Sequence, residues 1–191
     1  MNLFLDAVSK NAYICLFDEK RNIIDEQNFS VYQNESSILP KLIDNFIKKN
    51  KLFYKDIENI VVVEGPGSFT GIRTIILVVN TIAFAFPNIY LTGISFFDLF
   101  ENYPIIKISS KRDIFFQKNK NETIQILKNE EFQALIKQKN IEYVFGDYSD
   151  GESLFGINID EKIFYDNIIK NIIFTNKKSL EALYIKKPSI S

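Results

Sequence analysis

The sequence contains no histidine among its 191 residues and only one cysteine, Cys15. Histidine is the commonest metal ligand and the side chain whose pKa lies nearest neutrality. Its absence excludes the usual zinc sites, Ser–His–Asp triads and Cys–His pairs, and the lone cysteine excludes a disulfide within the chain. Any chemistry would have to use carboxylates, hydroxyls, lysine, arginine or backbone amides.

An excess of positive charge is also missing. The 23 basic residues face 24 acidic ones, and residues 1–99 alone carry 9 basic and 11 acidic side chains. A domain that holds RNA or DNA by itself needs a net positive surface, so this class is excluded. The hydrophobic content of 46% is typical of a globular chain.

Long apolar runs are absent as well. Asp6 interrupts the apolar start too early for a signal peptide, and the longest apolar stretch, residues 72–86, contains Arg73, Thr74 and Asn80. A membrane-spanning helix needs about 18 or more apolar residues. We therefore expect a cytoplasmic protein that does not enter a membrane.

Alternating and periodic apolar residues predict the elements of the first half. Residues 3–7, 12–17 and 23–32 are typical of three antiparallel strands, and residues 36–49 of a helix. A buried strand at 60–63, a helix at 71–86, a strand at 89–94 and a short helix at 95–100 follow. The predicted order is βββ-α-β-α-β.

The second half repeats this order in a reduced form. We expect strands at 105–109, 112–118, 123–127 and 141–145, and helices at 130–138, 160–174 and 178–185. No segment rich in proline, glycine or serine separates the halves. The sequence therefore predicts two α/β subdomains of the βββαβα type, at residues 1–100 and 101–191, the second being smaller.

The most specific segment links the strand at 60–63 to the following helix. A helix start offers free N–H groups that favour an anion, and glycine allows close approach of the backbone. The segment can be a phosphate-binding loop, or a tight connection that touches no ligand. It matches neither a Walker A nor a Rossmann fingerprint. Its candidate binding residues are Gly65, Pro66, Gly67, Ser68, Phe69, Thr70, Gly71 and Arg73.

The residues GPGSFTGIR at 65–73 closely resemble the signature of the TsaB (YeaZ-like) family. Four weaker segments fit in the same order: LFLD at 3–6 with Ala12, SSILP at 36–40, KRDIFF at 111–116 and YIKKP at 184–188. The resemblance is firm over residues 1–100 and loose beyond them.

This resemblance implies an actin/Hsp70/sugar-kinase-like (ASKHA) fold and a noncatalytic role. Such proteins pair with a paralogue, TsaD, and act with a TsaE-like ATPase to install threonylcarbamoyl on the adenosine beside the tRNA anticodon. The resemblance implies no cofactor for the isolated chain and contact with tRNA only through the complex. Whether the isolated chain is a monomer or a homodimer stays open at the level of the sequence. TsaD carries a histidine metal site, which a chain without histidine cannot provide.

The turn after Asp6 departs from the family. Ala7 and Val8 stand where the family usually has Thr followed by Ser or Ala, and the missing hydroxyls argue against nucleotide binding there. ATP-using members of the superfamily use an aspartate at the place of Asp6 to hold a metal–nucleotide complex; here we expect it to form a turn. The alternative function is a small-molecule kinase or ATPase, but that would need a second glycine-rich loop. A peptidase is the least favoured hypothesis, because the chain lacks a nucleophile–base pair.

The helix at 71–86 is apolar on nearly every side, so it must be fully buried or meet a partner. With the helix that begins at Ser36 it predicts a subunit interface, so a glutamate at Ile76 or Val79 should give a folded monomer. The alternative is complete burial. The predicted interface residues are Leu39, Ile43, Phe46, Ile47, Ile72, Ile76, Val79 and Ala83.

Overall fold

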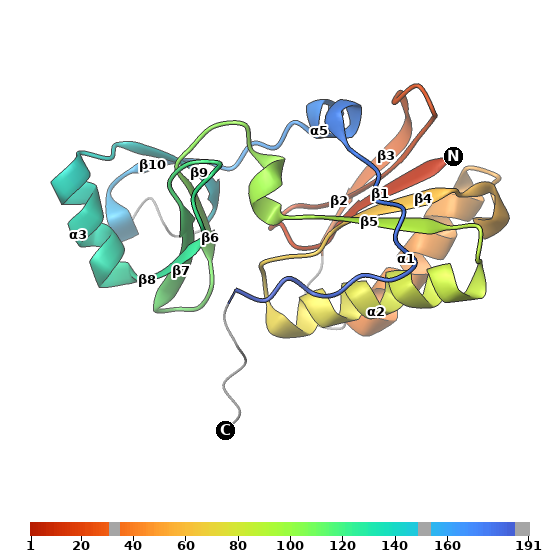
Figure 1. The fold of residues 1–191 in the computed structure, drawn as a ribbon, viewed down its shortest axis with the longest axis horizontal. Coiled ribbons are helices and arrows are strands. Elements are labelled where there is room, and N and C mark those ends of the chain that lie inside the picture. The colour runs from red at the N-terminus through yellow and green to blue at the C-terminus, as the bar shows by residue number, and fades with distance from the viewer. Residues whose placement is uncertain (31–34, 149–153, 186–191) are drawn as a thin grey trace. The chain divides into compact units, whose positions relative to one another are not determined.

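The computed structural model describes residues 1–30, 35–148 and 154–185, with the side chains of 35–37 and 69 left out. The chain divides into two units (Figure 1): Met1–Ser95 with Tyr165–Leu183, and Phe96–Phe164 with the chain from Tyr184 onward. The expected division into 1–100 and 101–191 therefore needs correction, because the chain returns to the first unit at Tyr165. Local periodicity cannot reveal such a return.

The first unit is built on a five-stranded mixed sheet in the order β3-β2-β1-β4-β5. The strands β1, β2 and β3 form the expected antiparallel meander, and β1, β4 and β5 run parallel. Every residue of β1 and β2 is buried, because these strands lie in the interior of the sheet. The bounds are β1 (Asn2–Asp6), β2 (Ala12–Phe17), β3 (Ile23–Phe29), β4 (Asn59–Val63) and β5 (Tyr90–Ile94).

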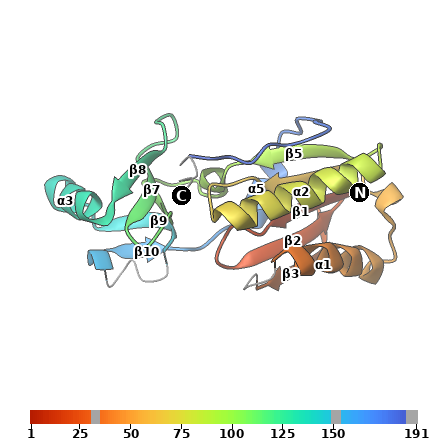
Figure 2. The same ribbon diagram turned by 90° about the horizontal axis from the view of Figure 1, so that it is seen from below.

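Two helices, α1 (Glu35–Lys49) and α2 (Phe69–Ala85), cover one face of this sheet (Figure 2). Their apolar residues pack with the sheet residues Leu3, Leu5 and Val62 in one core. A short 3-10 helix, η1 (Tyr54–Asp56), precedes β4. The helix α5 (Tyr165–Asn171) lies on the other side of the sheet, where its Tyr165 meets Phe4 of β1.

The segment after α5 is extended, so the helix predicted at 178–185 is wrong. Lys177 forms an isolated antiparallel bridge with Leu91 of β5, through two backbone hydrogen bonds of 2.8 and 3.0 Å. Further along, the backbone of Leu180 binds the Asn80 side chain of α2. The backbone N–H and C=O groups of Lys177 and Leu180 thus bind Leu91 and Asn80, whereas in a helix they would bind each other's neighbours within the segment. We call residues 175–183 the strap.

The second unit repeats the plan of the first. Its five-stranded sheet has the order β10-β9-β6-β7-β8, which matches β5-β4-β1-β2-β3 position by position. Strand β10 ends at Asp160, where the sequence predicted a helix over 160–174 to begin, and the helix in that range, α5, covers only Tyr165–Asn171. The bounds are η2 (Phe96–Leu99), β6 (Ile105–Ile108), β7 (Asp113–Gln117), β8 (Gln125–Lys128), α3 (Asn129–Lys139), β9 (Tyr143–Asp147) and β10 (Asn158–Asp160).

The core of the second unit lies between α3 and its sheet, where Phe132 of α3 packs with Ile106, Ile114, Phe116 and Val144. The repeated mixed sheet with helices confirms the predicted α/β fold class. Within the described residues, no helix has the length and apolar content needed to cross a bilayer.

Candidate functional site

The glycine-rich segment connects β4 to α2, as predicted. The backbone leaves β4 at Val63 and enters α2 at Phe69, two residues before the expected start at Gly71. Ser68 is the N-cap, because its Oγ accepts a 3.0 Å hydrogen bond from the Gly71 amide. This bond satisfies one of the free amides at the helix start.

The chain itself fills the space around the loop glycines. Gly65 has a φ of 125°, which favours glycine, and a Cβ there would lie 2.9 Å from the carbonyl oxygen of Leu183. A Cβ on Gly67 would lie 2.9 Å from Cγ1 of Val8. The Leu183 amide also donates a 3.0 Å hydrogen bond to the Glu64 carbonyl. The loop is therefore packed between the β1–β2 hairpin and the strap.

Asp6, at the end of β1, is fully buried and forms the hairpin turn that the sequence predicted. Its Oδ1 accepts 2.9 Å hydrogen bonds from the amides of Val8 and Ser9. Its Oδ2 accepts hydrogen bonds from the hydroxyls of Ser9, at 2.5 Å, and Tyr165, at 2.8 Å. A carboxylate offers about four acceptor positions, so these bonds use its full capacity.

Tyr165 is the member of this site that the sequence did not reveal. Its ring stacks on Tyr13 of β2, with centroids 3.8 Å apart and planes 4° from parallel. Burial, followed by the charge of Asp6, raises the pKa of Tyr165 far above its ordinary value. Burial, followed by the bond to Glu26, raises the pKa of Tyr13 in the same way. Both phenols remain protonated donors, and no local pattern links Tyr165 to Asp6 across 159 positions.

Cys15 lies buried on β2, where burial raises the pKa of its thiol to about 12. A thiol in this state is a poor nucleophile. Among the residues that the structure describes, no group of three acidic or cysteine side chains is placed to hold a metal ion.

The structure corrects the choice of interface residues. Leu39, Ile43, Phe46, Ile47, Ile72, Ile76, Val79 and Ala83 are all at most 7% exposed and belong to the core of the first unit. Their side chains face the sheet and the neighbouring helix, so a glutamate at Ile76 or Val79 would disrupt this core.

The solvent-facing side of α2 carries two large apolar side chains that are not part of this core. Leu77 is 68% and Phe84 is 88% exposed. The exposed residues Arg73 and Thr81 lie on the same side, at a spacing of four from Leu77. Those two polar residues were the sequence signal for which side of the helix faces solvent. We call Leu77, Thr81 and Phe84 the outer face of α2.

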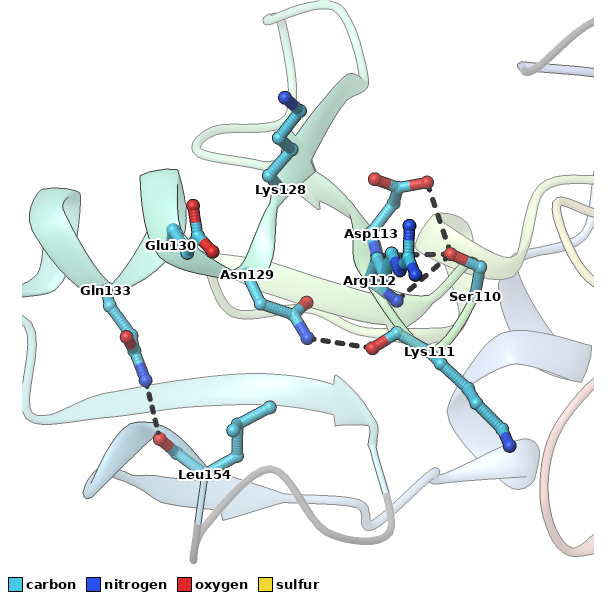
Figure 3. Close-up of a pocket in the computed structure, with 9 residues that line it drawn as sticks. All are labelled: Ser110, Lys111, Arg112, Asp113, Lys128, Asn129, Glu130, Gln133 and Leu154. Atoms are coloured by element: carbon cyan, nitrogen blue, oxygen red, sulfur yellow. Dashed lines mark hydrogen bonds between the residues drawn. The ribbon is translucent and has the colours of Figure 1, made fainter.

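A hollow lies in the second unit, between the β6–β7 turn and the start of α3 (Figure 3). It measures about 760 Å³ and has basic, acidic and amide groups together. Several of these groups bind one another: Asn129 Nδ2 donates to the Lys111 carbonyl at 3.2 Å, and Gln133 Nε2 to the Leu154 carbonyl at 2.9 Å. The hollow is lined by Ser110, Lys111, Arg112, Asp113, Lys128, Asn129, Glu130, Gln133 and Leu154.

The fold and the packed loop define a two-unit α/β protein of the ASKHA-like class, and comparisons with known proteins agree. A crystal structure from Pseudomonas aeruginosa, described as an uncharacterized protein with similarity to peptidase YEAZ, matches with a TM-score of 0.71. The match covers 97% of this chain and 99% of that one at 14% identity. YeaZ from the same organism matches with a TM-score of 0.51 over 66% of this chain and 63% of that one, at 16% identity.

The sequence comparisons then identify the family. The model of the TsaD family, tRNA N6-adenosine threonylcarbamoyltransferase, matches residues 30–98. The uncharacterized MG208 homolog of Mycoplasma pneumoniae is 30% identical over 97% of this chain and 95% of its own length. MG208 of Mycoplasma genitalium is 26% identical over the same shares. The chain belongs to the same family as these mycoplasma proteins. It is TsaB/YeaZ-like, because it shares its fold with the YeaZ structures and carries a TsaD-like segment at residues 30–98.

Proposed function

We propose that this chain is a noncatalytic subunit that supports a TsaD-like paralogue in adding threonylcarbamoyl to the adenosine beside the tRNA anticodon. The family relationship supports a role in tRNA modification. The observation that carries the noncatalytic role is the Asp6 carboxylate, whose acceptor positions are used by Val8, Ser9 and Tyr165. An aspartate that held a metal–nucleotide complex would need to give up these bonds first.

The glycine-rich loop supports the same proposal. Val8 and Leu183 lie against Gly67 and Gly65, so this chain itself occupies the space that the two glycines leave open. The segment therefore acts as a structural connection that orients α2. We propose no cofactor for the isolated chain.

We propose that the outer face of α2 receives the paralogue. Fully burying a side chain the size of leucine or phenylalanine stabilises a complex by about 1.5–3 kcal/mol, before the costs of association. Leu77 and Phe84 are the strongly exposed apolar residues of α2 among the described side chains. The interface thus remains on the helix expected from the sequence but uses its opposite side.

The remaining partners form part of the same proposal. A TsaE-like ATPase acts with the pair, tRNA is held only by the assembled complex, and the system is cytoplasmic. In the absence of the paralogue the outer face of α2 supports a homodimer. A net charge of −1 agrees with weak binding of tRNA by the chain alone.

The test mixes the purified chain with its TsaD-like paralogue and measures association by light scattering, and folding by circular dichroism. Phe84→Glu and Leu77→Glu should leave the chain folded and weaken association at least tenfold, since an unpaired charge would be buried. Ile173→Glu is the control, because Ile173 is 84% exposed and follows α5 on the opposite side of the sheet. Equal association of all three variants would place the interface elsewhere.

The activity test compares tRNA modification by the paralogue with and without this chain. The proposal expects modification to require both proteins and the isolated chain to hydrolyse no ATP. ATP turnover by the isolated chain above about 1 s⁻¹, an ordinary enzyme rate, would favour the kinase or ATPase alternative.

A further inference from the structure

Three contacts connect α5 to the start of α2 through the hairpin between β1 and β2. The Tyr165 hydroxyl binds Asp6 Oδ2 at 2.8 Å. The other oxygen of Asp6 holds the amides of Val8 and Ser9 at 2.9 Å. The Val8 side chain then lies against Gly67, next to the N-cap of α2.

The geometry restricts Tyr165 to this position. Its ring is stacked on Tyr13 at 3.8 Å and meets Phe4 edge-on at 5.6 Å. Ile169, one turn further along α5, is completely buried. The hydroxyl is therefore held at Asp6 by the packing of both the ring and the helix.

We propose that Tyr165 is an internal ligand of Asp6 and that α5 thereby latches the β1–β2 hairpin in one conformation. Through Val8 and Gly67, the same latch fixes the loop that leads into α2. The start of α2 is then ordered by the chain itself and needs no bound molecule. Tyr165 acts here as a positioning residue.

Amide hydrogen exchange of the isolated chain, measured by NMR, tests the latch without any partner. Tyr165→Phe removes only the hydroxyl. It should speed exchange of the Val8 and Ser9 amides about ten- to a hundredfold, the range for a lost hydrogen bond to a charged group. The Gly71 amide should also exchange faster, whereas Val61 and Val62 in β4 should not.

Tyr13→Phe is the matched control, because it removes a hydroxyl from the stacked partner ring, whose bond goes to Glu26 instead. Tyr13→Phe should leave the exchange rates of the Val8 and Ser9 amides unchanged. In a Val8→Ala background, Tyr165→Phe should still affect Ser9 but no longer Gly71, since the contact with Gly67 is gone.

Unchanged exchange at Val8 and Ser9 in Tyr165→Phe would overturn the latch. An equal acceleration at every amide, β4 included, would also overturn it, because that result reports only lost global stability. If Tyr165→Phe does not fold, the wild-type chain still gives an answer. Its Val8 and Ser9 amides must open at the same urea concentration as Ile169 of α5, and protection that outlasts α5 would refute the proposal.

Discussion

The Cγ1 atom of Val8 occupies the space that any side chain on Gly67 would need, since a Cβ there would lie 2.9 Å away. The β1–β2 hairpin and the glycine-rich loop, which are far apart in sequence, thus pack against each other at one methyl group of Val8. A side chain on Gly67 and a branched side chain at position 8 therefore exclude each other.

Gly67→Ala should destabilise the chain by about 1–3 kcal/mol, the usual cost of overpacking. The backbone of Gly67 lies outside the left-handed region, so the effect is steric. Urea unfolding measures it. Val8→Ala in the same chain should recover most of the loss by removing the opposing methyl groups. A double variant whose loss equals the sum of both single losses would show that the two sites are independent.

Ser68→Ala should lower the free energy of unfolding by about 1 kcal/mol, because the Gly71 amide loses its cap. Thr70→Ala is the control on the same turn, since Thr70 is exposed and follows the cap. It should change stability by less than about 0.5 kcal/mol. Thermal unfolding of both variants measures the difference, and equal losses would show that the cap bond contributes nothing.

Much of the first unit could be predicted because its signals are local. The buried run in β4, the glycine turn and the cap at Ser68 follow each other within a few residues. Each predicts one element directly: a buried strand, a tight turn and a helix start. The repeated order of elements predicted two similar units. The chain's return to the first unit at Tyr165 could not be predicted, because it depends on contacts between distant residues.

The candidate site shows the same limit. Asp6 could be assigned to a turn from its neighbours, but its bond to Tyr165 spans 159 positions. An apolar helix predicts burial without saying which side is buried, so the chosen interface residues of α2 were those of the core. The polar residues Arg73 and Thr81 contained the missing information about its outer face.

Stability should fall as the pH rises above about 9. Burial raises the pKa of Cys15 from 9.0 in the unfolded chain to about 12 in the fold. Between these values the unfolded chain loses the thiol proton while the folded chain keeps it, so unfolding is favoured as pH increases. The loss should be about 1 kcal/mol between pH 9 and 10, measured by urea unfolding.

Cys15→Ala provides the control for this prediction. The variant cannot ionise at this position, so its stability should change less over the same interval. Tyr13 and Tyr165, whose ordinary pKa is 10.0, add to the loss at higher pH in both proteins. An identical pH dependence of the two chains would show that Cys15 ionises normally in the fold.

The strap should detach from α2 when the Asn80 side chain is replaced by that of alanine. The Asn80 side chain donates a 3.0 Å bond to the Leu180 carbonyl and accepts a 2.9 Å bond from its amide, as a neighbouring strand would. Asn80→Ala removes both bonds and should free the strap at a cost of about 2 kcal/mol. Cleavage by trypsin after Lys177 and Lys178 should then become about thirtyfold faster, because a locally opened segment is the one that is cut.

Asn88→Ala is the matched control for strap release. Asn88 makes the same kind of side-chain bonds, at 3.3 and 3.0 Å, but to the carbonyls of Lys55 and Ile57. Removing the Asn88 side chain destabilises another part of the first unit and leaves the hydrogen bonds between Asn80 and Leu180 in place. Mass spectrometry of the fragments should therefore show early cleavage at the strap only in Asn80→Ala. Equal cleavage there in both variants would mean that trypsin cuts the globally unfolded chain and that Asn80 does not hold the strap.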